Sequence, residues 1–131
     1  MRKPLTIPKL KKKLDTVFSR WVRLSETDNG WGRCVTCGRT KMFKELDAGH
    51  FISRNCTPLR WDIRNVHIQC QRCNRFLGGQ IEEYFLWMEN EYGRDVVDEM
   101  ISRKHDMFKL KRKWLEEQIE ILKKKIEAVD K

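Results

Sequence analysis

Residues 47–74 read DAGHFISRNCTPLRWDIRNVHIQCQRCN, and this stretch decides how the middle of the chain folds. It ends on a C-x-x-C pair, and an earlier pair lies upstream with 32 residues between the two. Two residues between cysteines let both sulfurs face one ion, and four such sulfurs complete a tetrahedral site. We therefore expect a structural zinc ion with four ligands: Cys34, Cys37, Cys70 and Cys73. A redox role for either pair is the alternative, which the presence of two pairs disfavours.

The size and composition of the chain limit the class of protein. It has 131 residues, of which 36% are charged, and a net charge of +9. Such a chain forms one domain or a small core with helical extensions, and a metal would help to stabilise it. The sequence has no run of 18 apolar residues and no signal-peptide pattern. We expect a soluble cytoplasmic protein without a membrane partner, in which disulfides are rare and cysteines bind metal or stay free.

Positive charge is concentrated near the amino terminus. Residues 1–24 carry eight Lys or Arg and one Asp, whereas residues 80–103 carry seven acidic and two basic residues. A basic arm favours a polyanionic partner, because Lys and Arg displace the counterions condensed on nucleic acid. Charge alone does not separate this interpretation from a solvated surface. The lysines that we single out for DNA contact are Lys11, Lys12 and Lys13.

Composition and hydrophobic spacing divide the chain into three parts. Residues 1–30 form the basic arm and an amphipathic helix, expected over 10–24. Residues 31–79 hold short segments, five glycines and all five cysteines, which indicates a small α+β zinc unit. Residues 80–131 form a helical extension, with helices expected over 81–92, 94–104 and 108–129.

The last helix has a heptad seam. Its apolar residues follow a 4,3,4,3 spacing: Leu115, Ile119, Leu122, Ile126 and Val129. Such a seam forms a homodimer or folds back on the core of its own chain. We slightly favour folding back.

The segment between the cysteine pairs fits a hairpin. One strand is expected over 48–52 and the other over 65–69, and the second cysteine pair starts a short helix with Asn74 in its first turn. A hairpin followed by a helix, pinned by zinc, brings four polar side chains together: His50, Asn65, His67 and Asn74.

This arrangement resembles the HNH (His-Me finger, ββα-metal) nuclease pattern. That pattern has a histidine on the first strand, an asparagine five residues before the C-x-x-C pair and a polar residue straight after it, here His50, Asn65 and Asn74. Over nearly the whole chain, the segments FSRWVRL, CVTCG, DAGHFISR and LRWDIRNVHIQCQRCN, with a basic helical tail, resemble the phage recombination protein family NinG (Rap).

The resemblance implies a treble-clef-like ββα-metal core, stapled by zinc and flanked by amphipathic helices. It also implies an endonuclease of the host cytoplasm that cuts branched recombination intermediates, such as Holliday junctions and D-loops. By carry-over, His50 is the general base, Asn65 orients His50 or pins the hairpin loop, and Asn74 is a metal ligand. The chemistry suits these residues, because phosphodiester hydrolysis needs a base near neutral pH and a divalent cation such as Mg²⁺ or Mn²⁺.

One position departs from the pattern. Many HNH members have a metal ligand directly before the catalytic histidine, where this chain has Gly49. Asp47, with the same strand parity, is one candidate to replace that ligand, and His67 is a second that would favour Mn²⁺. Three further residues are candidates for phosphate contacts or merely solvated: Arg54, Arg60 and Arg64.

Three functions therefore compete at this point. The first is a metal-dependent DNA endonuclease. The second is a non-catalytic zinc-stapled module that binds DNA, which has no need of His50. The third is a protein adaptor that uses the heptad helix, for which DNA binding should be weak. The combination of DAGH, N-x-x-x-x-C and C-N favours the nuclease.

Overall fold

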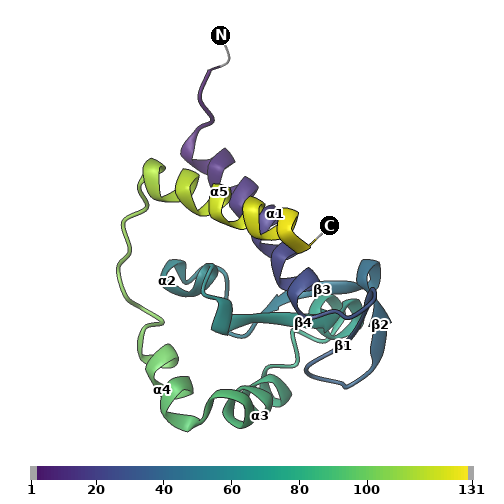
Figure 1. Ribbon diagram of the computed structural model, residues 1–131. Helices are drawn as coiled ribbons and strands as arrows, with labels where there is room; N and C mark the ends of the chain where they lie inside the picture. Colours follow the sequence, from purple (N-terminus) through teal and green to yellow (C-terminus); the bar gives the residue numbers. More distant parts are fainter. Residues whose placement is uncertain (1–2, 130–131) are drawn as a thin grey trace.

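The computed structural model describes residues 3–129 and has a mixed α+β fold (Figure 1). The helices are α1 (Ile7–Ser25), α2 (Thr57–Arg60), α3 (Ile81–Tyr92), α4 (Arg94–Ser102) and α5 (Arg112–Val129). The strands are β1 (Trp31–Arg33), β2 (Thr40–Met42), β3 (Leu46–His50) and β4 (Val66–Cys70). Tighter or wider helical turns occur at η1 (Phe43–Glu45), η2 (Ile63–Asn65) and η3 (Arg72–Phe76), the last of which is π-helical. The predicted α+β class is confirmed.

The strands form two separate antiparallel hairpins. β1 pairs with β2, and β3 pairs with β4 with Gly49 opposite His67. The first strand of the longer hairpin was predicted over 48–52 and begins and ends two residues earlier. The reason lies in Asn65, whose side chain takes over the backbone N–H and C=O of Ile52 and so replaces the strand ladder there.

The first hydrophobic core joins the terminal helices to the β3–β4 hairpin. α1 and α5 lie side by side (Figure 1). The buried members are Leu10, Leu14, Phe18 and Val22 of α1, Leu115, Ile119 and Leu122 of α5, and Leu46, Val66 and Ile68 of the hairpin. The heptad seam is therefore used within the chain, as the favoured alternative predicted. Val129, by contrast, is half exposed, and α5 begins at Arg112 rather than at residue 108.

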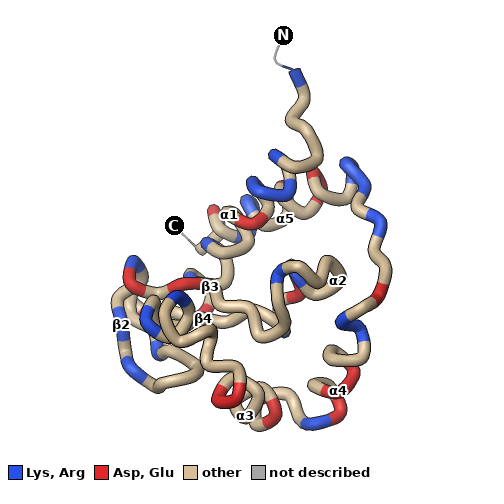
Figure 2. Tube along the Cα trace, turned by 180° about the vertical axis from the view of Figure 1, so that it is seen from behind, with Lys and Arg blue, Asp and Glu red and all other residues tan. Residues whose placement is uncertain are grey.

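A second core lies on the other side of the hairpin, where α3 and α4 cover the loop that follows β3. Its fully buried members include Tyr84, Met88, Val97 and Met100, which were predicted to be core. Ile81 and Ile101, also placed on the apolar faces of these helices, are 47% and 41% exposed. The Tyr84 hydroxyl donates to the Gly49 carbonyl at 2.7 Å, which ties α3 to β3. Acidic residues gather on the outer turns of α3 and α4 (Figure 2).

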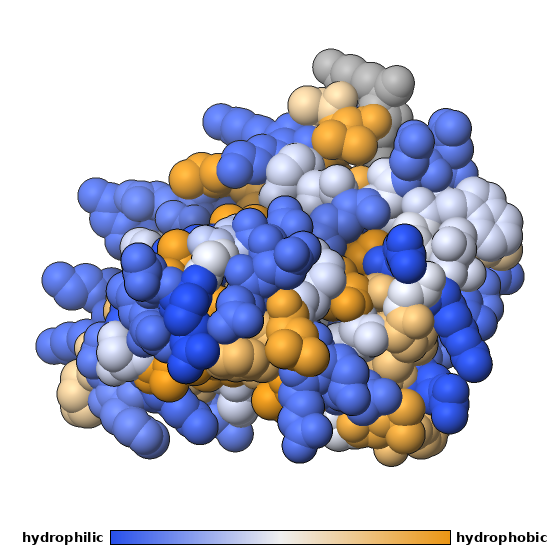
Figure 3. All heavy atoms as spheres, turned by 90° about the horizontal axis from the view of Figure 1, so that it is seen from below, coloured by the Kyte–Doolittle hydropathy of each residue, from blue (hydrophilic) through white to orange (hydrophobic). Residues whose placement is uncertain are grey.

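The face seen from below is mostly hydrophilic, and hydrophobic residues appear on it in scattered groups among hydrophilic ones (Figure 3). Among residues 3–129, none of the helices has the length and hydrophobicity that crossing a membrane requires.

Candidate zinc centre and basic cleft

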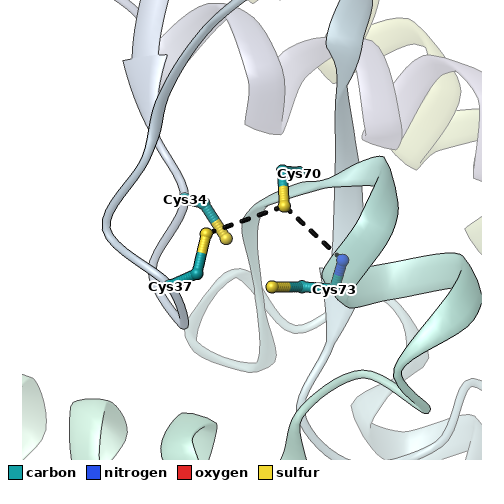
Figure 4. A group of neighbouring side chains, drawn as sticks. All are labelled: Cys34, Cys37, Cys70 and Cys73. Carbon is teal, nitrogen blue, oxygen red and sulfur yellow. Dashed lines mark hydrogen bonds between the residues drawn. The ribbon is translucent and has the colours of Figure 1, made fainter.

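The four cysteines of the two C-x-x-C pairs meet at one point. All four sulfurs lie within 4.8 Å of one another, and the Cys37 and Cys70 sulfurs are 3.7 Å apart (Figure 4). Sulfurs about 2.3 Å from a tetrahedral zinc ion are separated by about 3.8 Å. The predicted ligands are therefore close enough together to bind a zinc ion.

Local backbone structure brings each pair to this point. Cys34 and Cys37 sit in the turn between β1 and β2, where Gly38 has a φ of 78° and donates its N–H to the Cys34 carbonyl at 2.9 Å. That φ favours glycine. Cys70 ends β4, and Cys73 is the second residue of the η3 turn, with its backbone nitrogen 3.5 Å from the Cys70 sulfur.

The electrostatics of the cluster favour a bound cation. Burial opposes ionisation of Cys34, but the Thr36 hydroxyl and backbone amides lower its pKa to about 6. Burial raises the pKa of Cys73 to about 12. A thiolate beside protonated thiols is the pattern expected when like charges share a small space. A divalent ion would offset that repulsion and fits this all-sulfur donor set.

A cleft of about 1020 Å³ opens beside the β3–β4 hairpin. It is bordered by α1, β3, the loop after β3, and the η3 turn. Six basic residues line it: Arg23, Lys44, Arg54, Arg60, Arg75 and Lys104. Its two acidic residues are Asp15 and Asp47, and both are already paired with arginines. The cleft therefore has a net positive charge.

His50 lies at the end of β3 and lines this cleft. Its Nε2 is 2.8 Å from the Arg60 carbonyl oxygen. A carbonyl only accepts, so Nε2 carries the proton and Nδ1 keeps its lone pair. Burial lowers the pKa of His50 below its usual 6.5, against the opposing effect of the Arg60 carbonyl. The imidazole is therefore neutral near pH 7 and able to accept a proton.

Asn65 is fully buried and points into the loop after β3. Its Oδ1 accepts from the Ile52 N–H at 2.8 Å, and its Nδ2 donates to the carbonyls of Ile52 and Leu59 at 2.9 and 3.0 Å. Of the two roles considered for Asn65, this geometry is that of pinning the loop. Leu59 precedes Arg60, so Asn65 also helps to fix the carbonyl that holds His50.

Asp47 and Asn74 meet in the same cleft. The Asn74 amide donates to the Asp47 carboxylate at 2.9 Å, which joins β3 to the η3 turn. Arg75 also binds this carboxylate through two N–H groups, each at 2.9 Å. Two of the predicted metal-ligand candidates are therefore neighbours, and both line the cleft that His50 lines.

Gly49 has a steric role that its place in the motif does not reveal. A Cβ built on Gly49 would lie 1.8 Å from Oε1 of Gln69, a fully buried side chain of β4. Gln69 is fixed because its amide nitrogen donates to the Gly79 carbonyl at 2.8 Å and to Thr36 at 3.1 Å. The space that a side chain at position 49 would enter is thus filled by the Gln69 side chain.

The structure does not bring His67 into this cleft. His67 pairs with Gly49 across the hairpin, is 5% exposed, and lines a different hollow beside the cysteine turn. Its Nδ1 binds the Glu26 carboxylate at 2.6 Å, and its Nε2 is 3.0 Å from both the Arg64 carbonyl and the Tyr92 hydroxyl. Both ring nitrogens are therefore engaged in holding α1 and α3 to the hairpin.

The predicted phosphate contacts are divided between two places. Arg54 and Arg60 line the cleft and bind Asp15 of α1. Arg64 instead pairs with Asp62 and Glu99, and Lys11, Lys12 and Lys13 lie along α1 outside the residues that line the cleft. Lys13 faces Lys123 of α5, which lowers the pKa of Lys13.

Sequence reasoning missed four of the six basic residues of the cleft: Arg23, Lys44, Arg75 and Lys104. A signal for Arg23 was present, because Asp15, Ser19 and Arg23 follow one another at intervals of four and form a polar stripe beside the buried face of α1. Nothing comparable marks Lys44, which depends on the fold of η1.

Comparisons with known proteins identify the family. The model of the family described as bacteriophage lambda NinG protein matches residues 3–131. The chain is 33% identical over 93 residues to protein ninG of Escherichia phage 933W, which is 70% of this chain and 43% of that protein. It is 36% identical over 70 residues to protein ninG of Escherichia phage lambda, which is 53% of this chain and 34% of that protein.

Both relatives are longer proteins, and the chain covers less than half of their length. No solved structure matches the chain. Because the family model spans nearly all of the sequence, the chain belongs to the NinG family of phage proteins.

Proposed function

We propose that this chain is a metal-dependent DNA endonuclease of the HNH type, with His50 as its general base. The observation that carries the proposal is the hydrogen bond from His50 Nε2 to the Arg60 carbonyl at 2.8 Å. It fixes the tautomer whose Nδ1 can take a proton from water, in a cleft that also holds the Asp47–Asn74 pair.

The order of the elements supports the proposal. β3 carries Asp47 and His50, β4 follows in an antiparallel hairpin, and the η3 turn carries Asn74. This is the strand–strand–helix order of a ββα-metal motif. The cysteine cluster closes the hairpin onto the η3 turn, so a zinc ion there would have a structural role rather than a catalytic one.

The catalytic cation would be Mg²⁺ or Mn²⁺, held by the oxygens of Asp47 and Asn74. These donors fit, since Mg²⁺ in proteins is bound through one or two carboxylates, several waters and substrate phosphates. Such a cation would neutralise charge on the scissile phosphate and the leaving oxygen. Arg75, whose side chain is 54% exposed, would exchange its bond to Asp47 for a phosphate contact.

The charge of the cleft supports DNA as the substrate. Arg75 binds Asp47, and five further basic residues line the same cleft as His50. A polyanion would gain contacts along the whole cleft and release its counterions. We extend the proposal to branched recombination intermediates, such as Holliday junctions and D-loops, on the resemblance to NinG (Rap) described above.

A homodimer would suit paired cuts in two strands and remains part of the proposal. The heptad seam of α5 packs on α1 of the same chain, so a second copy would have to use the outer face of α5, which carries Ile121.

The test is cleavage of a labelled four-way junction beside duplex and single-stranded DNA, with Mg²⁺ or Mn²⁺. Wild type should cut, and His50→Ala should cut about 10²–10⁴-fold more slowly. His105→Ala is the matched control, because His105 is an exposed histidine between α4 and α5 and should leave cleavage unchanged. Zinc content and the melting temperature should be the same in all three proteins.

Binding measurements separate the competing functions. Salt-sensitive binding of DNA without cutting by any of these proteins, in either metal, would make the chain a non-catalytic zinc-stapled module. Weak binding at about 50 mM salt would contradict both DNA functions and favour the adaptor.

A further inference from the structure

We infer that Asp15 of α1 is a positioning residue, which sets the tautomer and orientation of His50 through Arg60 and Trp61. The inference rests on the proposed function, in which His50 is the base. Asp15 lies 35 positions before His50 in the chain and stands outside the HNH motif, so the motif gives no indication of this role.

Asp15 binds the α2 segment through several bonds at once. Its Oδ1 accepts from Arg60 Nε at 2.9 Å and from the Trp61 indole N–H at 2.9 Å. Its Oδ2 accepts from Arg60 Nη2 and from Arg54 Nη2, the latter at 3.1 Å. The Arg60 side chain is only 13% exposed, so the two-pronged bond is largely shielded from water.

These bonds fix the carbonyl that selects the His50 tautomer. Arg60 ends α2, and its own carbonyl oxygen accepts from His50 Nε2. Asp15 therefore reaches His50 in two steps, from carboxylate to Arg60 side chain and from Arg60 backbone to imidazole. Asn65 fixes the preceding carbonyl, that of Leu59, from the other side.

α1 gives Asp15 a fixed position from which its carboxylate can hold the α2 segment. α1 is anchored in the first core by Leu14 and Phe18, which flank Asp15 on the buried face. Trp61 also packs on Trp114 of α5 with ring centroids 5.8 Å apart. The segment that holds His50 is thus tied to the packed α1–α5 pair rather than left as a free loop.

An alternative role for Asp15 is electrostatic. Its charge occupies Arg54 and Arg60, so it could merely weaken their contacts with phosphate. The two roles predict different effects on turnover. If Asp15 acts only electrostatically, Asp15→Asn leaves kcat unchanged or raises it. If Asp15 positions His50, Asp15→Asn lowers kcat by up to about 100-fold, while KM for DNA stays equal or falls because a negative charge leaves the cleft.

The experiment compares wild type, Asp15→Asn and the control Asp62→Asn, each with zinc bound. Asp62 is a suitable control because it also binds an arginine and caps a turn of the same loop, but through Arg64. Imidazole ¹⁵N shifts would be recorded beside kcat and KM. Wild type and Asp62→Asn should show Nε2–H at His50, and Asp15→Asn should show a mixture of tautomers with lower kcat.

Trp61→Phe provides a second variant in case Asp15→Asn fails to fold. It removes the indole N–H bond and keeps the ring contact, so it should shift the tautomer in the same direction by a smaller amount. An unchanged His50 tautomer in both variants would overturn the inference, as would an unchanged or higher kcat in Asp15→Asn. If wild type cuts no DNA, the proposed function fails, and the ¹⁵N shifts still decide whether Asp15 positions His50.

Discussion

At the scale of single residues, the loop between β3 and β4 is held by buried polar side chains rather than by regular pairing. The Asn65 amide group serves as the hydrogen-bond partner of three backbone groups of the loop. Each of these backbone groups would otherwise be buried without a partner, which is expensive in a protein interior. The loop can therefore keep an irregular path and still present His50 and Arg60 in a fixed relation.

We predict that Asn65→Ala lowers the free energy of unfolding by about 1–3 kcal/mol or more, because it leaves buried backbone N–H and C=O groups unpaired. Urea unfolding of the zinc-bound protein measures this change. Asn55→Ala, in the exposed part of the same loop, should change it by less than about 0.5 kcal/mol. Equal effects of the two substitutions would show that the Asn65 side chain does not pin the loop.

Gly49 provides a second test at this scale. Gly49→Ala should destabilise the fold by about 1–3 kcal/mol, since the new methyl group meets the fixed Gln69 amide. Gly49→Ala combined with Gln69→Ala should lose less stability than the sum of the two single changes. Purely additive losses, measured by urea unfolding, would contradict the steric account of why this chain has no ligand before its histidine.

At the scale of elements, the apolar faces of the helices determine which elements pack together. The buried face of α1 and the seam of α5 enclose one core with the hairpin. Leu115 is fully buried there, whereas Ile121 on the same helix is 46% exposed.

Leu115→Ala should lower the free energy of unfolding by about 2–5 kcal/mol, and Ile121→Ala by less than about 0.5 kcal/mol. The unfolding midpoint should be independent of protein concentration, because the seam is satisfied within one chain. A midpoint that rises with concentration would show instead that α5 pairs between chains.

The sequence predicted secondary structure best where the spacing of apolar residues repeats over several helical turns. The helices over 10–24, 81–92 and 94–104 were predicted nearly in place because their apolar stripes repeat over several turns. The long hairpin was found but shifted, because a side chain, Asn65, ends the strand pairing. The β1–β2 hairpin was missed, since strands of three residues carry no periodic signal.

The candidate site was likewise predicted in part. The meeting of the four cysteines followed from spacing alone. The predicted hairpin and helix, pinned by zinc, placed His50 and Asn74 close together, and both line one cleft. The position of His67 was not predicted, because residues on one strand face were assumed to reach one site, whereas Glu26 and Tyr92 hold His67 elsewhere. Glu26 directly follows α1 and Tyr92 ends α3, and both positions lie outside the motif.

At the scale of the whole molecule, the cysteine cluster joins two hairpins, which are also linked by the bond from the Val35 N–H to the Ile68 carbonyl at 3.1 Å. β1 and β2 have three residues each, and such short strands are marginal on their own. The η3 turn that carries Asn74 also begins at this cluster. A metal bound by the four sulfurs would therefore hold both the small hairpin and one wall of the basic cleft.

We predict that the cluster binds zinc and that removal of the ion unfolds this part of the chain. We predict that a chelator, or Cys34→Ser, lowers the melting temperature sharply, since structural zinc contributes about 10 kcal/mol or more in small units. Cys56→Ser should keep zinc, because Cys56 lies in the second core, away from the cluster. Calorimetry with and without chelator measures both effects, and an unchanged melting temperature would show that the cluster holds no structural metal.

The account as a whole depends on His50 as a neutral base, and the pH dependence of cleavage tests that claim most directly. We would measure single-turnover rates from roughly pH 5 to 8 with fixed metal. Because burial lowers the pKa of His50 below 6.5, the rate should be constant near pH 7 and above. It should fall about tenfold per pH unit below that pKa, and His50→Ala should be slow and lack this step. A wild-type rate that is independent of pH over this range, or matched by His50→Ala, would contradict the account.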